Sequence, residues 1–132
     1  MRFTYDCPVR WSDMDAFGHI NNARFLTLYE EARVELMFLG AREAGVTSME
    51  SGIVIFRHEV DYLRPVDFGP PVRIEMWIEE LRPSRFTVVY ELFADGELAS
   101  RARSVCVPYD LEHSRPRRLS DAERDYLTPW LQ

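Results

Sequence analysis

Two acids, a glycine and a histidine lie close together in residues 12–20, which read Ser-Asp-Met-Asp-Ala-Phe-Gly-His-Ile. Two asparagines follow, and the side-chain oxygen of Asn21 or Asn22 suits the cap of a helix, because it accepts from free backbone N–H groups. The first turn of a helix offers unpaired N–H groups and a positive dipole end, which stabilise an oxyanion. The carboxylate of Asp15, just upstream, then lies opposite these donors. This is the minimal layout for acyl transfer.

Other interpretations of the same loop remain open. Asp13 suits a turn carboxylate better than a second catalyst, because aspartate closes turns through bonds to its own backbone. His19 fits either catalysis or a structural role in the loop. Asp13, Asp15 and His19 are all possible metal ligands, but the only other histidines, His58 and His113, are scattered. Without a second ligand cluster we predict no metal site.

A long helix is predicted from residue 23. Its apolar positions recur every three or four residues, and a second apolar set widens the buried surface. Gly40 is the expected C-terminal stop, which gives about five turns. The charged positions Glu30, Glu31, Arg33 and Glu35 are expected on a solvated or inter-subunit face of this helix.

Strands account for most of the remaining chain. Alternating or β-rich patterns predict strands at 3–11, 53–63, 72–81, 85–94 and 98–109. The short turns between the last four predict that successive strands are antiparallel neighbours. Ser120 and Glu123 form a capping-box pattern that predicts a short C-terminal helix. The expected architecture is a single α+β domain over residues 1–132, with a curved antiparallel sheet of about five strands around one long helix.

Composition excludes several classes of protein. Apolar residues make up 46% and charged residues 29% of the chain, which is ordinary globular composition. No apolar run approaches the roughly 20 residues of a membrane helix, and the N-terminus does not resemble a signal peptide. Two cysteines without a secretion signal favour a reduced, cytoplasmic protein. The net charge of −6 argues against a nucleic-acid partner.

Every basic residue is an arginine, since the chain contains no lysine. Planar guanidinium groups pair with phosphate oxygens in a bidentate way. Several arginines in the second part of the chain are therefore candidates for holding a phosphorylated ligand, although solvated edge charges would give the same pattern. They are Arg82, Arg85, Arg101, Arg103, Arg115, Arg117 and Arg118.

The run D-x-D-x-x-G-H-x-N-N-x-x-[FY], leading into a helix with E-E-A-R, resembles the 4-hydroxybenzoyl-CoA thioesterase family of hotdog-fold enzymes. The resemblance continues through residues 61–69 and the turn before Phe86, and it departs at Pro70, where the family usually has aspartate. It implies that Asp15 is the catalytic carboxylate, as a nucleophile or as a general base. It also implies that the N–H of Asn22 is the oxyanion donor, that Gly18 permits close approach of the substrate, and that His19 polarises the carbonyl or orients water.

The resemblance also implies the substrate and the assembly. The expected reaction is hydrolysis of an acyl-CoA thioester, or of the acyl carrier protein equivalent, without a cofactor. The expected assembly is a homodimer or homotetramer in which sheets pair edge to edge, with no nucleic-acid or membrane partner. Residues expected to contact the substrate across the subunits or at its nucleotide end are Arg57, His58, Glu59, Arg82, Ser84 and Arg85.

Two other functions fit a chain of this kind. One is a hotdog-fold lyase related to enoyl-CoA hydratases, whose D-x-x-x-x-H pattern is imitated here only by Asp15 and His19, one residue too close. The other is a non-catalytic acyl-CoA binding protein, against which the combination of Asp15, Gly18 and His19 argues. The sequence does not specify the acyl group.

Overall fold

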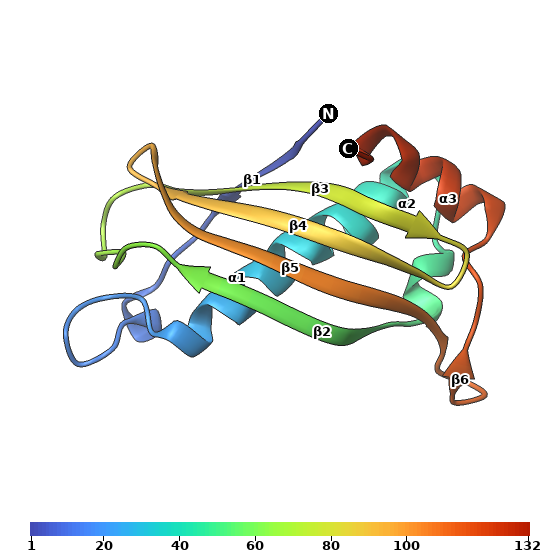
Figure 1. Cartoon of the computed structure of the whole chain (residues 1–132), viewed down its shortest axis with the longest axis horizontal. Helices are drawn as coiled ribbons and strands as arrows, with labels where there is room; N and C mark the ends of the chain where they lie inside the picture. The colour runs from blue at the N-terminus through green and yellow to red at the C-terminus, as the bar shows by residue number, and fades with distance from the viewer.

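A computed structural model describes the whole chain, residues 1–132, as one antiparallel sheet curved around a long helix (Figure 1). The order of the main strands is β1-β3-β4-β5-β2, and a short β6 pairs with the end of β5. The bounds are β1 Phe3–Cys7, β2 Ile53–Tyr62, β3 Val72–Arg82, β4 Arg85–Ala94, β5 Glu97–Asp110 and β6 Arg115–Pro116. This arrangement is the hotdog fold, and the predicted fold class is confirmed.

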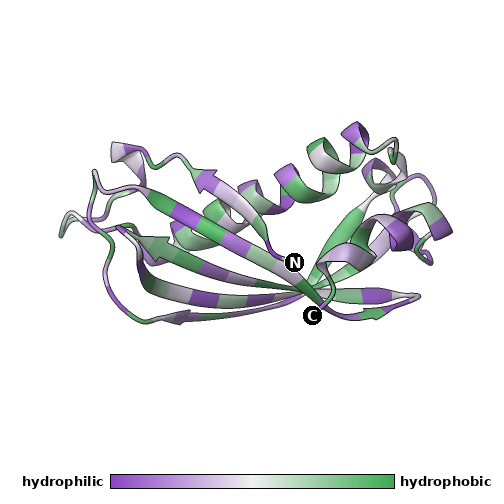
Figure 2. Ribbon diagram, turned by 90° about the horizontal axis from the view of Figure 1, so that it is seen from above, coloured by the Kyte–Doolittle hydropathy of each residue, from purple (hydrophilic) through white to green (hydrophobic).

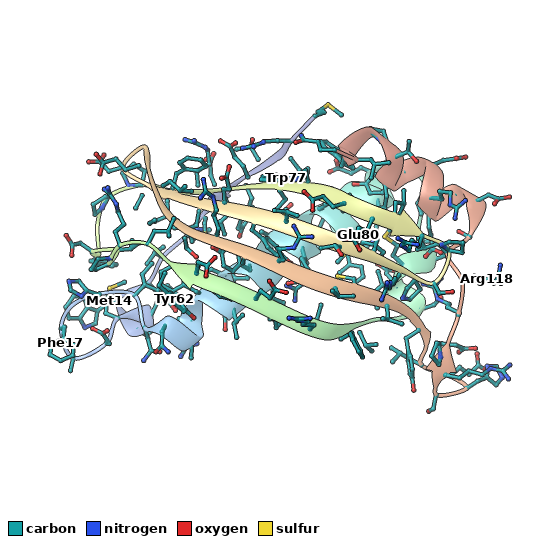
Figure 3. The ribbon with its side chains drawn as sticks, in the orientation of Figure 1. Met14, Phe17, Tyr62, Trp77, Glu80 and Arg118 are labelled. Carbon is teal, nitrogen blue, oxygen red and sulfur yellow. The ribbon has the colours of Figure 1, made fainter.

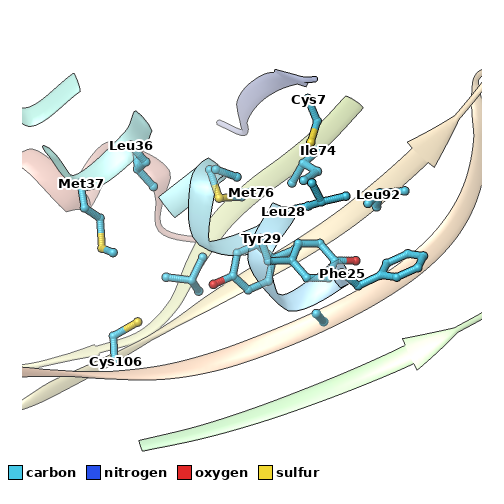
Figure 4. Close-up of a cluster of buried hydrophobic side chains, with 14 of the residues drawn as sticks. Cys7, Phe25, Leu28, Tyr29, Leu36, Met37, Ile74, Met76, Leu92 and Cys106 are labelled. Carbon is cyan, nitrogen blue, oxygen red and sulfur yellow. The ribbon is translucent and has the colours of Figure 1, made fainter. Parts of the chain in front are cut away.

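The helix lies on the concave face of the sheet, and the two elements enclose the core (Figure 2). Side chains alternate in burial along β3, where Val72, Ile74, Met76 and Ile78 point inward. The helix contributes a buried stripe that includes Phe25, Leu28, Tyr29, Ala32 and Leu36 (Figure 4). Each large apolar side chain buried in this way contributes about 1.5–3 kcal/mol. The core therefore fixes the helix, and with it the loop that precedes the helix, against the sheet.

The helix continues beyond the predicted stop at Gly40. Its segments α1 (Asn22–Val34), η2 (Glu35–Gly40, a π-helical turn) and α2 (Ala41–Glu43) run on without a break. Gly40 is helical, at φ −65°, and a Cβ there would lie 2.6 Å from the Tyr126 hydroxyl oxygen. That hydroxyl group donates to the carbonyl of Leu36 at 2.6 Å. The prediction was therefore wrong because Gly40 makes room for Tyr126 beside the π-turn.

The helix ends at Gly45, which adopts the left-handed conformation at φ +84°. The Gly45 amide donates to Arg42 at 2.9 Å, and the Val46 amide donates to Ala41 at 2.7 Å. These two bonds form a Schellman motif, in which a glycine terminates a helix without a steric penalty.

The order of the strands corrects a second prediction. The strands β3, β4 and β5 are successive antiparallel neighbours, as expected, but β2 pairs with β5 and not with β3. Residues 63–71 cross from one side of the sheet to the other, and β1 occupies the free edge of β3. The first strand is also shorter than predicted, because the chain forms a 3-10 turn at Trp11–Asp13. One edge of β2 remains unpaired in this chain.

The C-terminal helix α3 (Asp121–Leu127) forms as predicted. Ser120 accepts from the Glu123 amide at 3.1 Å, and the Glu123 carboxylate accepts from the Ser120 amide at 2.7 Å. Both bonds of the capping box are thus present. None of the helices combines the length and the apolar composition that crossing a membrane requires.

Candidate active site

The acidic loop folds into a tight turn. Met14 and Ile20 form an isolated antiparallel bridge at its base. The Asp15 amide donates to the His19 carbonyl at 2.7 Å, and the Gly18 amide donates to the Asp15 carbonyl at 3.1 Å. Gly18 closes the turn at φ +78°, a conformation that side-chain-bearing residues rarely adopt. A Cβ at this position would meet no atom within 4 Å, so the requirement for glycine here is conformational.

The carboxylate of Asp15 is held by the backbone of the same turn. Its Oδ1 accepts from the amide of Phe17 at 2.8 Å and from the amide of His19 at 3.1 Å. Its other oxygen has no hydrogen-bond partner within the chain. Asp15 lines an open cavity of about 340 Å³, together with His19, Ile20, Asn22, Phe25, Tyr62, Leu63, Arg64 and Pro65. The turn therefore leaves one carboxylate oxygen available beside this cavity.

The first residue of α1 lines the same cavity. Asn21 is the N-cap, and its side chain accepts from the Ala23 amide at 2.9 Å. The Arg24 amide donates to the carbonyl of Asn21 at 2.9 Å. The amide of Asn22 has no acceptor in the chain, as expected at the first position of a helix. A free backbone donor and the Asp15 carboxylate thus both border the cavity.

His19 and Asp13 differ in what they can do. The Nε2 atom of His19 lies 3.5 Å from the carboxylate of Asp67, and the ring borders the cavity. Asp13 is 1% exposed, and its Oδ2 accepts from the Arg10 amide at 2.8 Å. This is the turn-closing position predicted for Asp13, away from the cavity.

The remaining predicted site residues lie elsewhere in this chain. Arg57 and Glu59 form an ion pair of 3.1 Å on β2, and both border a separate cavity of about 230 Å³ that also contains Arg85. His58 projects to the opposite, helix-facing side, where its Nδ1 lies 2.7 Å from the hydroxyl oxygen of Ser104. None of the three borders the Asp15 cavity.

Arg82, Ser84 and Arg85 lie at the turn between β3 and β4, at the far end of the sheet. Tyr62 pairs with Ser100, whereas Phe86 pairs with Cys106. At about 3.4 Å per residue, these two levels of β5 lie about 20 Å apart. Figure 3 shows the same separation, with Met14 and Tyr62 at one end and Glu80 and Arg118 at the other. The Arg82 turn of one chain therefore does not meet that chain's own Asp15 cavity.

Three of the arginines considered for phosphate binding are already paired with carboxylates. Arg101 contacts Glu91 at 3.0 Å, and Arg103 contacts Glu79 at 2.7 Å, both through strand side chains. Arg117 forms two bonds, of 2.7 and 3.0 Å, with the fully buried Glu123. Arg82, Arg85, Arg115 and Arg118 make no ion pair. These four remain free for a phosphate.

One charged residue was misplaced by the sequence patterns. Arg33, expected on a solvated or inter-subunit face, is only 6% exposed and donates to the Tyr90 hydroxyl oxygen at 2.9 Å. Little in the sequence indicates that Arg33 is buried, because it shares a helix turn with two charged residues that reach solvent. Glu30 is exposed and Glu31 is half-buried.

Comparison with known proteins places the chain in a family. The model of the Thioesterase-like superfamily matches residues 9–130. A protein of Gloeothece citriformis named 1,4-dihydroxy-2-naphthoyl-CoA hydrolase is 32% identical over 120 residues, which cover 84% of this chain and 83% of that protein. The chain therefore belongs to the Thioesterase-like superfamily. The predicted enzyme class, a thioester hydrolase, is confirmed.

Solved structures are similar over the whole fold. A structure described as a predicted thioesterase from Bacillus stearothermophilus has a TM-score of 0.88 and 27% identity, covering 100% of this chain and 98% of that chain. A thioesterase of Thermus thermophilus, complexed with coenzyme A and Zn, has a TM-score of 0.76 and 33% identity, covering 98% of this chain and 92% of that chain.

Proposed function

We propose that this protein hydrolyses acyl-CoA thioesters to a carboxylic acid and free CoA, and that it is an enzyme of the 4-hydroxybenzoyl-CoA thioesterase type. One observation carries the proposal. The Asp15 carboxylate and the unpaired amide of Asn22 border a single cavity at the start of α1. The named activity of the Gloeothece protein and the coenzyme A bound to the Thermus protein support the choice of a CoA thioester.

The proposed chemistry follows from these two groups. The thioester carbonyl oxygen accepts from the Asn22 amide, and the positive end of the α1 dipole stabilises the charge that develops on this oxygen. The free oxygen of Asp15 either attacks the carbonyl carbon or removes a proton from an attacking water. In the first case the C–S bond breaks, CoA leaves as the thiolate, and water then hydrolyses the mixed anhydride on Asp15. In the second case the tetrahedral intermediate formed by water expels the CoA thiolate, which takes up a proton. The amides of Phe17 and His19 fix the other oxygen, so that the carboxylate is positioned before the substrate binds.

His19 and Gly18 have supporting roles in this proposal. His19 borders the cavity beside Asp15 and polarises the carbonyl or orients the water. Its Nε2 atom lies 3.5 Å from the carboxylate of Asp67. Gly18 gives the turn the left-handed backbone that it requires.

We further propose that the active enzyme is at least a homodimer, formed through the unpaired edge of β2. An exposed edge of ten residues is a template for pairing with another strand. If two β2 strands pair in an antiparallel way about a twofold axis, the end of one sheet that carries the β3–β4 turn lies beside the end of the other sheet that carries the Asp15 cavity. The Arg82 turn of one subunit then lies beside the Asp15 cavity of the other, where Arg82, Ser84 and Arg85 hold the nucleotide. Arg57, His58 and Glu59 lie along this pairing edge.

A panel of acyl-CoA and acyl carrier protein thioesters tests the function. We expect release of free thiol from CoA thioesters, with saturation kinetics. Hydration of an enoyl-CoA without release of thiol would identify a lyase instead. Tight binding without any turnover would identify a non-catalytic binding protein.

A further inference from the structure

The interval between α1 and β2, the α1–β2 groove, holds two separate cavities: the Asp15 cavity at the start of the helix and another farther along it. On β5, the side chains that face the helix are completely or almost completely buried: Ser100, Ala102, Ser104 and Cys106. On β2, their partners Tyr62 and His58 point to the same side but are exposed. The helix therefore covers β5 fully but β2 only in part, since Val60 and Ile55 on the same side of β2 are half-buried.

A second cavity of about 140 Å³ lies farther along this groove. Its walls are mostly apolar, with Val34, Met37, Phe38, Ile53 and Ile55. Glu30 and Arg33 also line it, and Glu30 is exposed to solvent. The cavity thus combines an apolar lining with one buried cation.

Arg33 carries a charge that the chain itself does not neutralise. The residue as a whole is 6% exposed, and the Tyr90 hydroxyl oxygen is its one hydrogen-bond acceptor in the chain. No carboxylate oxygen lies within 4.0 Å of it. A buried cation without an anionic partner is costly to fold, so its presence at a cavity points to an acceptor that arrives from outside the chain.

The side chains of Tyr90 and His58, which lie near Arg33, are held in place by contacts within the chain. Tyr90 is fully buried, and its ring lies 4.6 Å from that of Tyr29. The His58 ring contacts Ser104 on the same side of the sheet. Burial lowers the pKa of His58, and the nearby Arg33 lowers it further, although Glu30 acts in the opposite sense. At neutral pH the His58 ring is therefore uncharged, and it does not compete with Arg33 for an anionic group.

We infer that Arg33 is a specificity-determining residue that binds an oxygen acceptor, a carboxylate or a hydroxyl group, at the far end of the acyl group. The inference rests on the proposed thioesterase function and names its substrate class. The acyl group enters from the Asp15 cavity, runs along the α1–β2 groove and places its terminal oxygen at Arg33. An anionic oxygen supplies the charge that the buried guanidinium group lacks.

The length of the groove determines how long an acyl chain must be to reach from the Asp15 cavity to Arg33. Tyr62 lies at the level of the Asp15 cavity, and His58 lies at the level of Ser104, which is close to the hydroxyl end of the Tyr90 side chain. These two levels are about 13 Å apart at about 3.3 Å per residue. At the length of ordinary C–C single bonds, this distance corresponds to an extended chain of about ten carbon atoms.

Three matched CoA thioesters of this chain length test the inference: one ending in a methyl group, one in a hydroxyl group and one in a carboxylate. We expect the wild-type kcat/KM to be at least about tenfold higher for an oxygen-terminated chain than for the methyl-terminated chain, since the methyl group cannot accept a hydrogen bond from the charged guanidinium group. The comparison of the hydroxyl-terminated with the carboxylate-terminated thioester identifies which acceptor Arg33 binds.

The variant Arg33→Met separates selectivity from folding. We expect it to reduce the preference to within about threefold, while the melting temperature does not fall, because an unpaired buried charge is removed. Arg42→Met is the matched control, since Arg42 lies later on the same helix, is exposed and pairs with Glu50. This control should keep the wild-type preference.

Two results would overturn the inference: a wild-type preference for the methyl-terminated chain, or an unchanged preference in Arg33→Met. Failure of the proposed function looks different, because no thiol would be released from any of the three thioesters. In that event calorimetric binding of the same three compounds to wild type and Arg33→Met decides the inference. Equal affinities in the two proteins would refute it.

Discussion

The hydroxyl group of Tyr62 donates a hydrogen bond of 2.8 Å to the backbone carbonyl of Asn22. This bond joins the last residue of β2 to the first residue of α1 at the wall of the Asp15 cavity. The Tyr62 ring also packs edge-on against Phe25, with the ring centroids 5.1 Å apart. Tyr62 therefore holds the start of the helix, and the Asn22 amide with it, against the sheet.

The variant Tyr62→Phe should lower kcat about three- to tenfold, because it keeps the ring contact and removes a bond worth about 1 kcal/mol. The melting temperature should change little. Steady-state kinetics with one acyl-CoA measure the effect, and a kcat equal to wild type would show that the helix start needs no such support.

The arginines at the β3–β4 turn should contribute to binding of the nucleotide part of CoA and should not affect the chemical step. Arg82→Ala or Arg85→Ala should raise KM for CoA thioesters about tenfold with kcat nearly unchanged, since a charged hydrogen bond to phosphate is lost. The corresponding thioester of N-acetylcysteamine, which lacks the nucleotide, should be unaffected.

Arg101→Ala and Arg103→Ala are the matched controls, because both arginines are already paired with Glu91 and Glu79. If all four variants raised KM equally, a diffuse positive field would explain binding better than specific contacts at the turn.

The unpaired edge of β2 predicts the assembly. Light scattering at micromolar concentration should give at least twice the chain mass of 15.6 kDa. A mass of one chain across this concentration range would remove the basis for a nucleotide site contributed by the second subunit.

The buried pair of Arg117 and Glu123 predicts a stability that depends on pH. Burial raises the pKa of Glu123, but its bonds with Arg117 and Ser120 outweigh this effect, and the net pKa lies below the usual value of 4.5. A carboxyl with a depressed folded-state pKa stabilises the protein above its unfolded pKa. This stabilisation is lost as the pH falls below about 4.5 and through the folded-state pKa.

Glu123→Gln should therefore lower the free energy of unfolding at neutral pH by about 3 kcal/mol, because Arg117 loses its partner. The difference from wild type should shrink toward pH 3, as followed by urea denaturation, because the carboxyl group of the unfolded wild-type chain then binds a proton. The exposed Glu112→Gln is the control. A difference that stayed constant from pH 7 to pH 3 would contradict the assigned role of the pair.

The sequence predicted features that depend on near neighbours. Alternation along residues 72–82 and the capping box of Ser120 and Glu123 were both confirmed, because each is decided by residues a few positions apart. The acidic turn before the helix was found for the same reason. The family resemblance supplied the hotdog architecture.

Features that depend on distant partners were missed. Gly40 was predicted to end the helix, but the need for glycine there comes from Tyr126 of α3, whose hydroxyl group leaves no room for a side chain. This contact is not visible in the local sequence. The pairing of β2 with β5 depends on a crossing that no local pattern records. Arg33 looked exposed because its partner Tyr90 lies on β4, 57 positions along the chain.

The central claim is that the Asp15 carboxylate performs the chemistry. Asp15→Asn keeps an oxygen that accepts from the Phe17 and His19 amides, so the turn should fold and the melting temperature should hold. Asp13→Asn is the matched control, since Asp13 belongs to the same D-x-D pair but is buried away from the cavity.

The decisive measurement is the rate of thiol release from a saturating acyl-CoA by the wild type and these two variants. We predict a fall of about 10²–10⁴-fold for Asp15→Asn, the range for removal of a positioned acid or base. Acyl-CoA binding should be retained, and Asp13→Asn should stay within about tenfold of wild type. Turnover by Asp15→Asn within tenfold of wild type would contradict the claim.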